Sequence, residues 1–302
     1  MINLLRKLLG LKKISGLEKV FINLCKGFDE LKIDYVKNPT FNKILPGEPV
    51  IILGAGKYAL QGYKQLNPIV AGIGLMTHPS EWPDLFEEYP VAKYLQHSQW
   101  ANNVYIPYYG AGRCETWPAG IDTQKWAPDQ TSIKKFDILI YNKIRWNHEQ
   151  IYAELRDPIL KHLDLLDLSY KEIIYGRYKE TDYFSLLKQC RAMVFLCEHE
   201  SQGFACCEAL AMNVPVIAWN QGYCLDPNRF KWNDPDMIAT SIPFFDDRCG
   251  ISFADFEDFK NNINPFWDKV KDEKFNSRAY IMENLTLKKS AERMLEIVNN
   301  VY

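Results

Sequence analysis

The sequence predicts an α/β protein with two doubly wound domains, and two observations lead to this prediction. Short apolar segments of strand length alternate with segments of helical period through most of the 302 residues, a pattern typical of parallel βαβ units. A stretch dense in Gly, Pro and aromatic residues, 106–128, interrupts the alternation and indicates a domain boundary. A chain of this length can bury two modest cores.

The first half of the chain predicts one helix followed by strands. Residues 17–31 have the period of an amphipathic helix. The apolar runs that follow predict strands at 49–53, 69–76 and 91–95. The first of these strands ends in a glycine turn at 54–56, and a further helix is expected after the polar turn at 97–98.

The second half repeats the alternation more regularly. We expect strands at 136–141, 170–175, 193–197 and 215–219, and helices at 147–163, 183–190, 204–212 and 285–301. The predicted domains are residues 1–128, residues 129–284, and a terminal helix, residues 285–302, that returns to the first domain. In such folds, ligands bind at the carboxyl ends of the strands, between the domains.

Composition narrows the class of function. The net charge is −2 and the pI about 6.2, so the chain offers no basic field for a nucleic-acid backbone. The eight cysteines form no CxxC pair and are expected to be free thiols in a reducing cytoplasm. No apolar run reaches the ~20 residues that span a bilayer. Residues 1–14 interleave leucines with basic residues. This segment is expected to be a helix on an anionic membrane surface, a terminal helix packed on its own domain, or a frayed end.

The most informative segment follows the strand 193–197. This strand delivers Glu200 to the carboxyl edge of the sheet, and Gly203 allows a close backbone turn. The next helix then begins at Phe204 with its free N–H groups facing the edge, as a diphosphate site requires. Glu208 lies about one turn into that helix. Two carboxylates beside an anion site suit a ligand rich in hydroxyls.

This segment resembles the E-x7-E motif of retaining GT-B glycosyltransferases, particularly the large family 4. The motif there has the form Glu-x-Phe-Gly-(Leu)-x3-Glu-Ala-(Met)-Ala-x-Gly-x-Pro-Val-Ile. Two positions depart from it, since Gln202 replaces the usual Phe and Asn213 the usual Gly. The matching residues are Glu200, Gly203, Glu208, Ala209, Ala211, Pro215, Val216 and Ile217.

The resemblance extends from about residue 90 to the end of the chain and implies a role for each site residue. Segment 94–98 resembles the family's strand-then-serine step, 117–122 its interdomain linker, and Ile174-Tyr175-Gly176 the approach to the motif. It implies a GT-B fold with a shortened N-terminal domain. Glu208 would hold the ribose hydroxyls of the nucleotide and Glu200 the transferred sugar. The backbone N–H groups of Gly203, Phe204 and Ala205 would hold sugar and phosphate.

Basic and histidine candidates complete the expected site. The family places cations after the first strand of the second domain, where this chain has Lys143 and Arg145; either one would neutralise the leaving diphosphate without a metal. His78 resembles the family's histidine that faces the donor sugar. A structural role for His78 and a competing role for His97 are the alternatives.

Two further motifs have simpler interpretations. Gly54 and Gly56 match the GxGxxA dinucleotide fingerprint, but no acid ends the next strand as ribose binding would require. We expect these glycines, with Gly176, to let loops approach the donor. Asp234-Pro235-Asp236 has the DxD form of metal-binding glycosyltransferases but lies in a turn-rich stretch, so we expect no metal.

The predicted protein is a cytoplasmic glycosyltransferase that moves a hexosyl group from a nucleotide-diphosphate sugar to an acceptor hydroxyl. As the resemblance implies, the reaction would retain the anomeric configuration. UDP- or GDP-hexose would be the co-substrate, no other cofactor is expected, and the acceptor would be a carbohydrate or a lipid-linked molecule at the inner face of a membrane. The alternatives are an NAD-dependent oxidoreductase built on Gly54 and Gly56, a non-catalytic nucleotide-sugar-binding protein, and a hydrolysing epimerase or phosphorylase.

Overall fold

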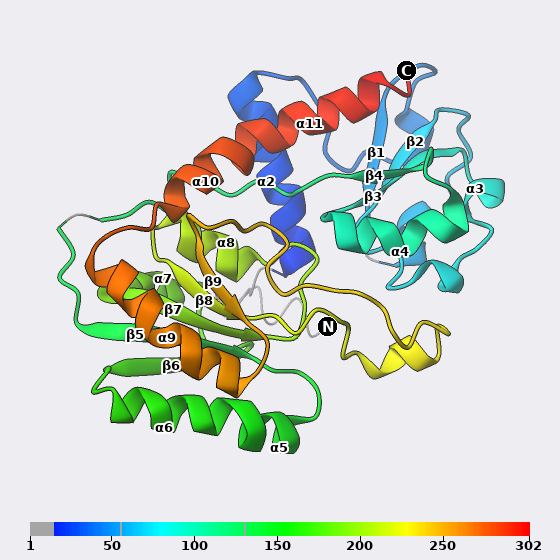
Figure 1. Ribbon diagram of the computed structural model, residues 1–302. Coiled ribbons are helices and arrows are strands. Elements are labelled where there is room, and N and C mark those ends of the chain that lie inside the picture. Colours follow the sequence, from blue (N-terminus) through cyan, green and yellow to red (C-terminus); the bar gives the residue numbers. More distant parts are fainter. Residues whose placement is uncertain (1–14, 55, 130) are drawn as a thin grey trace.

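The structure, a computed structural model, describes residues 15–54, 56–129 and 131–302. Two parallel sheets, each flanked by helices, lie side by side with the chain passing between them (Figure 1). None of the helices within the described ranges combines the length and the hydropathy that crossing a bilayer requires. The basic segment 1–14 lies outside the described residues.

The first sheet has four parallel strands in the order β1-β2-β3-β4. Ile69 and Ala71 point from β2 to one face, which the short helix α3 and helix α4 cover, whereas Val70 points to the other. The helices α2 and α11 cover that second face, where Leu24 and Met294 are buried (Figure 1). The strands are β1 (Val50–Leu53), β2 (Ile69–Gly72), β3 (Val91–Gln96) and β4 (Cys114–Thr116), and the helices α2 (Gly16–Leu31), α3 (Leu85–Glu88), α4 (Gln99–Tyr109) and α11 (Leu287–Asn299).

The second sheet has five parallel strands in the order β6-β5-β7-β8-β9. Its strands are β5 (Phe136–Lys143), β6 (Tyr170–Ile174), β7 (Cys190–Cys197), β8 (Val216–Trp219) and β9 (Gly250–Phe253). One face packs on α7 (Glu180–Gln189), α8 (Phe204–Ala211) and α10 (Ser277–Asn284). The other face packs on a helical run through α5 (His148–Ile151), a π turn (Tyr152–Arg156) and α6 (Asp157–Leu165), and on α9 (Phe256–Lys271).

The order of the second sheet creates a switch point between β5 and β7. From β5 the chain crosses to β6 on one side and then returns to form β7 on the other side. Ligands of open parallel sheets bind outside the carboxyl ends of the strands at such a point. The residues that follow β5 and β7 are therefore the ones best placed for function.

The chain crosses between the two sheets twice, and the two crossings are tied together. The backbone N–H of Ile121 in the first crossing donates to the carbonyl of Leu285 in the second, at 2.7 Å. Gly120 lies so close to α11 that a Cβ atom there would be 2.7 Å from the Cα of Leu287. The Asn23 amide on α2 donates to the Gly120 carbonyl at 2.7 Å. Both crossings are thus anchored to the helices on the first sheet.

The two parallel-sheet domains predicted from the sequence are confirmed, and several local expectations were wrong. β2 ends at Gly72 rather than continuing to residue 76, because Ile73 adopts a left-handed φ of 49° that ends the strand. The expected linker begins later than residue 106, since α4 continues to Tyr109 and β4 follows. Five elements were not predicted from the sequence: α3, β4, β9, α9 and α10.

Candidate active site

Lys143 and Glu200 meet at the switch point of the second sheet. Lys143 is the last residue of β5 and Glu200 lies three residues beyond the end of β7. The two side chains form an ion pair, and each is largely buried, with 13% and 15% of its surface exposed. The Lys143 ammonium also lies 4.4 Å from the ring centre of Tyr175, which follows β6. The site therefore draws on the ends of β5, β6 and β7.

The ion pair keeps Glu200 ionised in spite of its burial. Burial alone would raise the pKa of this carboxyl, but the charge and hydrogen bond of Lys143 hold it below its ordinary value. Burial would likewise lower the pKa of Lys143, and the charge of Glu200 raises it instead. The backbone of Glu200 is fixed from both sides, since its N–H donates to Thr240 and its carbonyl accepts from the Trp100 indole at 2.9 Å.

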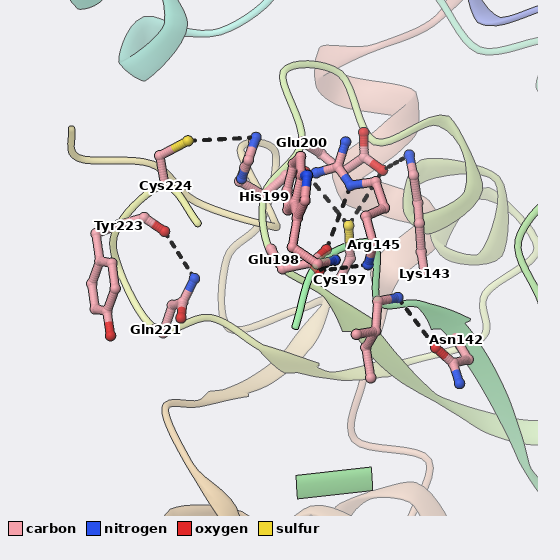
Figure 2. Close-up of polar contacts among 12 residues, drawn as sticks. Asn142, Lys143, Arg145, Cys197, Glu198, His199, Glu200, Gln221, Tyr223 and Cys224 are labelled. Atoms are coloured by element: carbon pink, nitrogen blue, oxygen red, sulfur yellow. Dashed lines mark hydrogen bonds and ion pairs between the residues drawn. The ribbon is translucent and has the colours of Figure 1, made fainter. Parts of the chain in front are cut away.

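Arg145 is held by a different carboxylate (Figure 2). The buried Glu198 accepts the backbone N–H groups of Arg145 and Trp146, at 2.6 and 3.1 Å. The Arg145 guanidinium lies 3.5 Å from Glu198 and donates to the carbonyl of His199 at 2.9 Å. Of the two predicted cations, Lys143 thus contacts Glu200 directly. Arg145 stabilises the loop that carries Glu200.

His199 lies between Glu198 and Glu200 in sequence, but its ring turns away from the Lys143–Glu200 ion pair. Its ring stacks on Trp146, 5.2 Å between centroids, and meets the edge of Trp100. Burial, aided by the nearby charge of Arg145, lowers its pKa to about 4. Its Nε2 lies 3.8 Å from the thiol of Cys224 (Figure 2).

The helix α8 opens next to this pair. Gly203 caps it with a left-handed φ of 68°, which glycine adopts without strain. Phe204 and Ala205 form its first turn, and the Ala205 carbonyl accepts the Tyr183 hydroxyl at 2.6 Å. The first N–H groups of an α-helix lack intrahelical partners. The predicted anion-binding residues therefore lie where the sequence analysis expected them, at a helix start beside Glu200.

Glu208 lies on the second turn of α8 and contacts the other domain. Its carboxylate accepts the Lys19 ammonium of α2 at 2.5 Å. Burial raises the pKa of Glu208 to about 7, although the Lys19 charge acts in the opposite direction. The sequence analysis missed Lys19, because a lysine on the polar face of an amphipathic helix gives no signal of its own.

Both departures from the motif have a structural explanation. Gln202 is buried and makes two hydrogen bonds to Ala119 of the first crossing, accepting its N–H at 2.8 Å and donating to its carbonyl at 3.1 Å. Asn213 follows α8 in the left-handed conformation, with φ 55°, which asparagine tolerates better than most residues. Its side-chain oxygen accepts the N–H of Arg278. Neither departure alters a carboxylate.

The described contacts of His78 do not reach the glutamates. The residue is buried after β2, with its Nδ1 2.8 Å from the Ser80 hydroxyl. Its ring stacks on Trp232, 4.9 Å between centroids and 7° between planes. Trp232 comes from the long segment between β8 and β9, so this histidine joins that segment to the first sheet. Burial lowers the pKa of His78.

The remaining predicted residues are turn glycines. Gly56 follows β1 with a φ of 74°, and its N–H donates to Gly74 at 2.7 Å. Gly176 has a φ of 86° and follows Tyr175, whose ring contacts Lys143. A Cβ atom on Gly176 would meet no other group, so its turn conformation is what calls for glycine.

Two further residues were not predicted: Trp100 holds the Glu200 carbonyl, and Glu198 holds the backbone of Arg145 and Trp146. Taken together, the site offers two buried carboxylates, each neutralised by a lysine, on either side of a helix start. Such a set can accept hydroxyl hydrogen bonds and can neutralise an anion.

Comparison with known proteins identifies the fold. No family model matches the chain, and no curated protein matches it. Among solved structures, it is similar to a glycosyltransferase from Rickettsia africae ESF-5, with 11% identity and a TM-score of 0.58, over 96% of this chain and 83% of that one. It is similar to AviGT4, a glycosyltransferase involved in avilamycin A biosynthesis, with 13% identity and a TM-score of 0.57, over 95% and 90%.

A third similar structure is the pneumococcal O-GlcNAc transferase GtfA in complex with UDP and GlcNAc. It has 13% identity and a TM-score of 0.52, over 81% of this chain and 54% of that one. At such low identity these likenesses bear on the fold alone. The chain has the GT-B fold, with two parallel-sheet Rossmann-like domains.

Proposed function

We propose that this protein is a glycosyltransferase that moves a hexosyl group from a nucleotide-diphosphate sugar to an acceptor hydroxyl. The observation that carries the proposal is the placement of Glu200, Lys143 and the start of α8 together at the switch point of the second sheet. This is the position at which open parallel sheets bind nucleotides. The likeness to solved glycosyltransferases of the same fold supports the choice of reaction.

In this proposal each group of the site has a separate task. Glu208 accepts the ribose hydroxyls, Glu200 accepts hydroxyls of the sugar, and the N–H groups of Gly203, Phe204 and Ala205 bind the diphosphate. Lys143 neutralises the charge that develops on the diphosphate as it leaves, so the reaction needs no metal. UDP or GDP is the nucleotide we favour, and binding of UDP by a protein of the same fold supports the first.

The reaction we propose retains the configuration of the sugar. The bond between the anomeric carbon and the diphosphate oxygen breaks, and the acceptor oxygen forms its bond to the same face of that carbon. The acceptor proton passes to the departing diphosphate, so no protein base is required. Glu200 orients the sugar and stabilises the developing positive charge. A carbohydrate or lipid-linked alcohol, reached at the inner face of a membrane, is the acceptor class that we propose.

A ligand panel tests the proposal. Thermal shift would be measured with UDP, GDP, ADP, their hexose conjugates and NAD(H), on the wild-type protein, Glu208→Gln and Glu292→Gln. Glu292 is a matched control, because it lies exposed on α11 and its ion pair with Lys288 stays within its own helix. A ligand at 100 times its dissociation constant adds about 2.7 kcal/mol of stability. We expect a shift with one nucleoside diphosphate that is lost in Glu208→Gln and kept in Glu292→Gln.

Turnover of the donor that binds would then be followed with simple sugars and lipid-linked alcohols as acceptors. Release of nucleoside diphosphate that depends on the acceptor supports a transferase, and NMR of the product gives its anomeric configuration. A shift with NAD(H) that survives Glu208→Gln would favour the oxidoreductase instead. Binding without turnover would favour a nucleotide-sugar-binding protein, and release without an acceptor alcohol would favour a hydrolysing epimerase or a phosphorylase.

A further inference from the structure

Four charged side chains form a continuous ionic chain from the surface to the buried end of the site. Lys125 in the first crossing pairs with Glu180, the first residue of α7. Glu180 pairs with Lys19 of α2 at 2.8 Å, and Lys19 pairs with Glu208 of α8 at 2.5 Å. Exposure falls along the chain, from 45% for the Lys125 side chain to 5% for Glu208. Lys19 thus brings a positive charge from α2 of the first domain to the buried Glu208 of the second.

Lys19 remains charged in this partly apolar setting. Its ammonium lies 5.6 Å from the ring centre of Trp126 and 5.5 Å from that of Phe204. Burial would lower its pKa, but the charges and hydrogen bonds of Glu208 and Glu180 raise it above its ordinary value. Phe204 is the first residue of α8. The ammonium therefore lies beside the helix start at which the proposed function puts the diphosphate.

The position of Lys19 is fixed by its helix. Ser15 caps α2, accepting the N–H of Glu18 at 3.1 Å, and Gly27 allows α2 to pack tightly on α11. The end of α2 that carries Lys19 is the one directed at the second domain (Figure 1). A long flexible side chain on a rigid helix can change its partner without movement of the backbone.

We propose that Lys19 is a donor-binding residue that exchanges Glu208 for the diphosphate when the nucleotide enters. This inference rests on the proposed function. A nucleoside diphosphate carries both hydroxyls and anionic oxygens, so the ribose takes over Glu208 while the diphosphate takes over Lys19. After this exchange Glu208 accepts hydrogen bonds from the ribose hydroxyls and Lys19 keeps an anionic partner, so neither buried group is left without a polar partner. Lys143 lies beside Glu200 within the second domain and meets the same diphosphate in the proposed function.

The exchange gives a measurable signature in the contribution of the phosphates to binding. Isothermal titration would give the affinities for uridine, UMP and UDP, and for guanosine, GMP and GDP, in the wild type, Lys19→Met and Lys19→Arg. Lys26→Met is the matched control, because Lys26 lies on the same helix and pairs with Asp122 at 2.6 Å, outside the ionic chain. Melting temperatures would verify that each variant is folded.

In Lys19→Met we expect the gain in affinity from nucleoside to nucleoside diphosphate to fall by about tenfold or more, the weight of one charge-assisted hydrogen bond. Lys19→Arg should keep most of this gain, and Lys26→Met all of it. Tighter binding of both nucleoside and diphosphate by Lys19→Met would overturn the proposal, since Lys19 would then only compete for Glu208. Equal gains in Lys19→Met and Lys26→Met would also overturn it. A wild-type protein that binds no nucleoside diphosphate would refute this inference and the proposed function together.

Discussion

Gly27→Ala is expected to destabilise the protein by separating α2 from α11. A Cβ atom at Gly27 would lie 2.5 Å from the backbone oxygen of Leu287 and 2.8 Å from the Cβ of Ala291. Ordinary contact begins at 3.4 Å, so the helices would have to part by about 0.9 Å, the difference between 3.4 and 2.5. Overpacking of this kind costs about 1–3 kcal/mol, and a backbone oxygen cannot turn aside, which favours the upper end of that range.

The same substitution also has a favourable component. Alanine is preferred over glycine inside a helix by about 1 kcal/mol, which leaves a net loss of roughly 2 kcal/mol. Gly16→Ala is the control, because Gly16 begins the same helix and its Cβ would meet nothing within 4 Å. Urea denaturation followed by tryptophan fluorescence should show a lower midpoint for Gly27→Ala and little change for Gly16→Ala. A Gly27→Ala protein as stable as the wild type would refute this account of the helix contact.

Three further predictions concern buried ionisable side chains. The folded-state pKa of Glu208 is about 7, above the ordinary 4.5, so the stability that its protonated form contributes is complete below pH 4.5 and is lost as the pH rises through 7. Glu208→Gln should therefore gain melting temperature relative to the wild type between pH 5 and pH 8. A difference in melting temperature that stays constant over this range would contradict the prediction. Burial lowers the pKa of His97 from 6.5 to about 4, so the neutral imidazole stabilises the folded protein fully above pH 6.5. This contribution to the free energy of unfolding, up to about 3 kcal/mol, is lost as the pH falls towards 4. His97→Asn should therefore flatten the acid side of the stability profile, and an unchanged slope would contradict the prediction. Lys143→Met leaves Glu200 buried without its cation and should lower the free energy of unfolding by about 3–5 kcal/mol in a denaturant titration. The double variant Lys143→Met/Glu200→Gln should recover part of that loss. Strictly additive losses in the single and double variants would contradict a coupled pair.

The sequence predicts this fold well where the chain alternates between buried strands and amphipathic helices. The segments 50–53 and 192–197, which contain Ile52 and Val194, are continuous apolar runs, as parallel strands covered on both faces require. β9 was missed because it is short and begins with Gly250, a residue depleted in strands. That glycine is required by packing, since a Cβ there would lie 1.8 Å from the Val216 oxygen, and no pattern in the sequence reports such an approach.

The candidate site was predictable only in its second-domain half. Glu200 and Gly203 lie between β7 and α8 and Glu208 lies within α8, so their spacing along the chain places them at one sheet edge. Lys19 reaches Glu208 across 189 positions of sequence, and local pattern contains no information about contacts of that range. Trp100 was missed for the same reason, because it reaches the Glu200 carbonyl across 100 positions.

The paired crossings restrict how the two domains can move. Because Ile121 and Thr286 form a β-bridge, we expect a relative motion of the domains to bend both segments at this bridge. The two lysine–glutamate pairs would respond differently to such a rotation. Lys143 and Glu200 belong to the same rigid body and would travel together, whereas opening would draw Lys19 away from Glu208. In the proposed function, the ribose contact of Glu208 would therefore depend on the angle between the domains, whereas the Lys143–Glu200 pair would not.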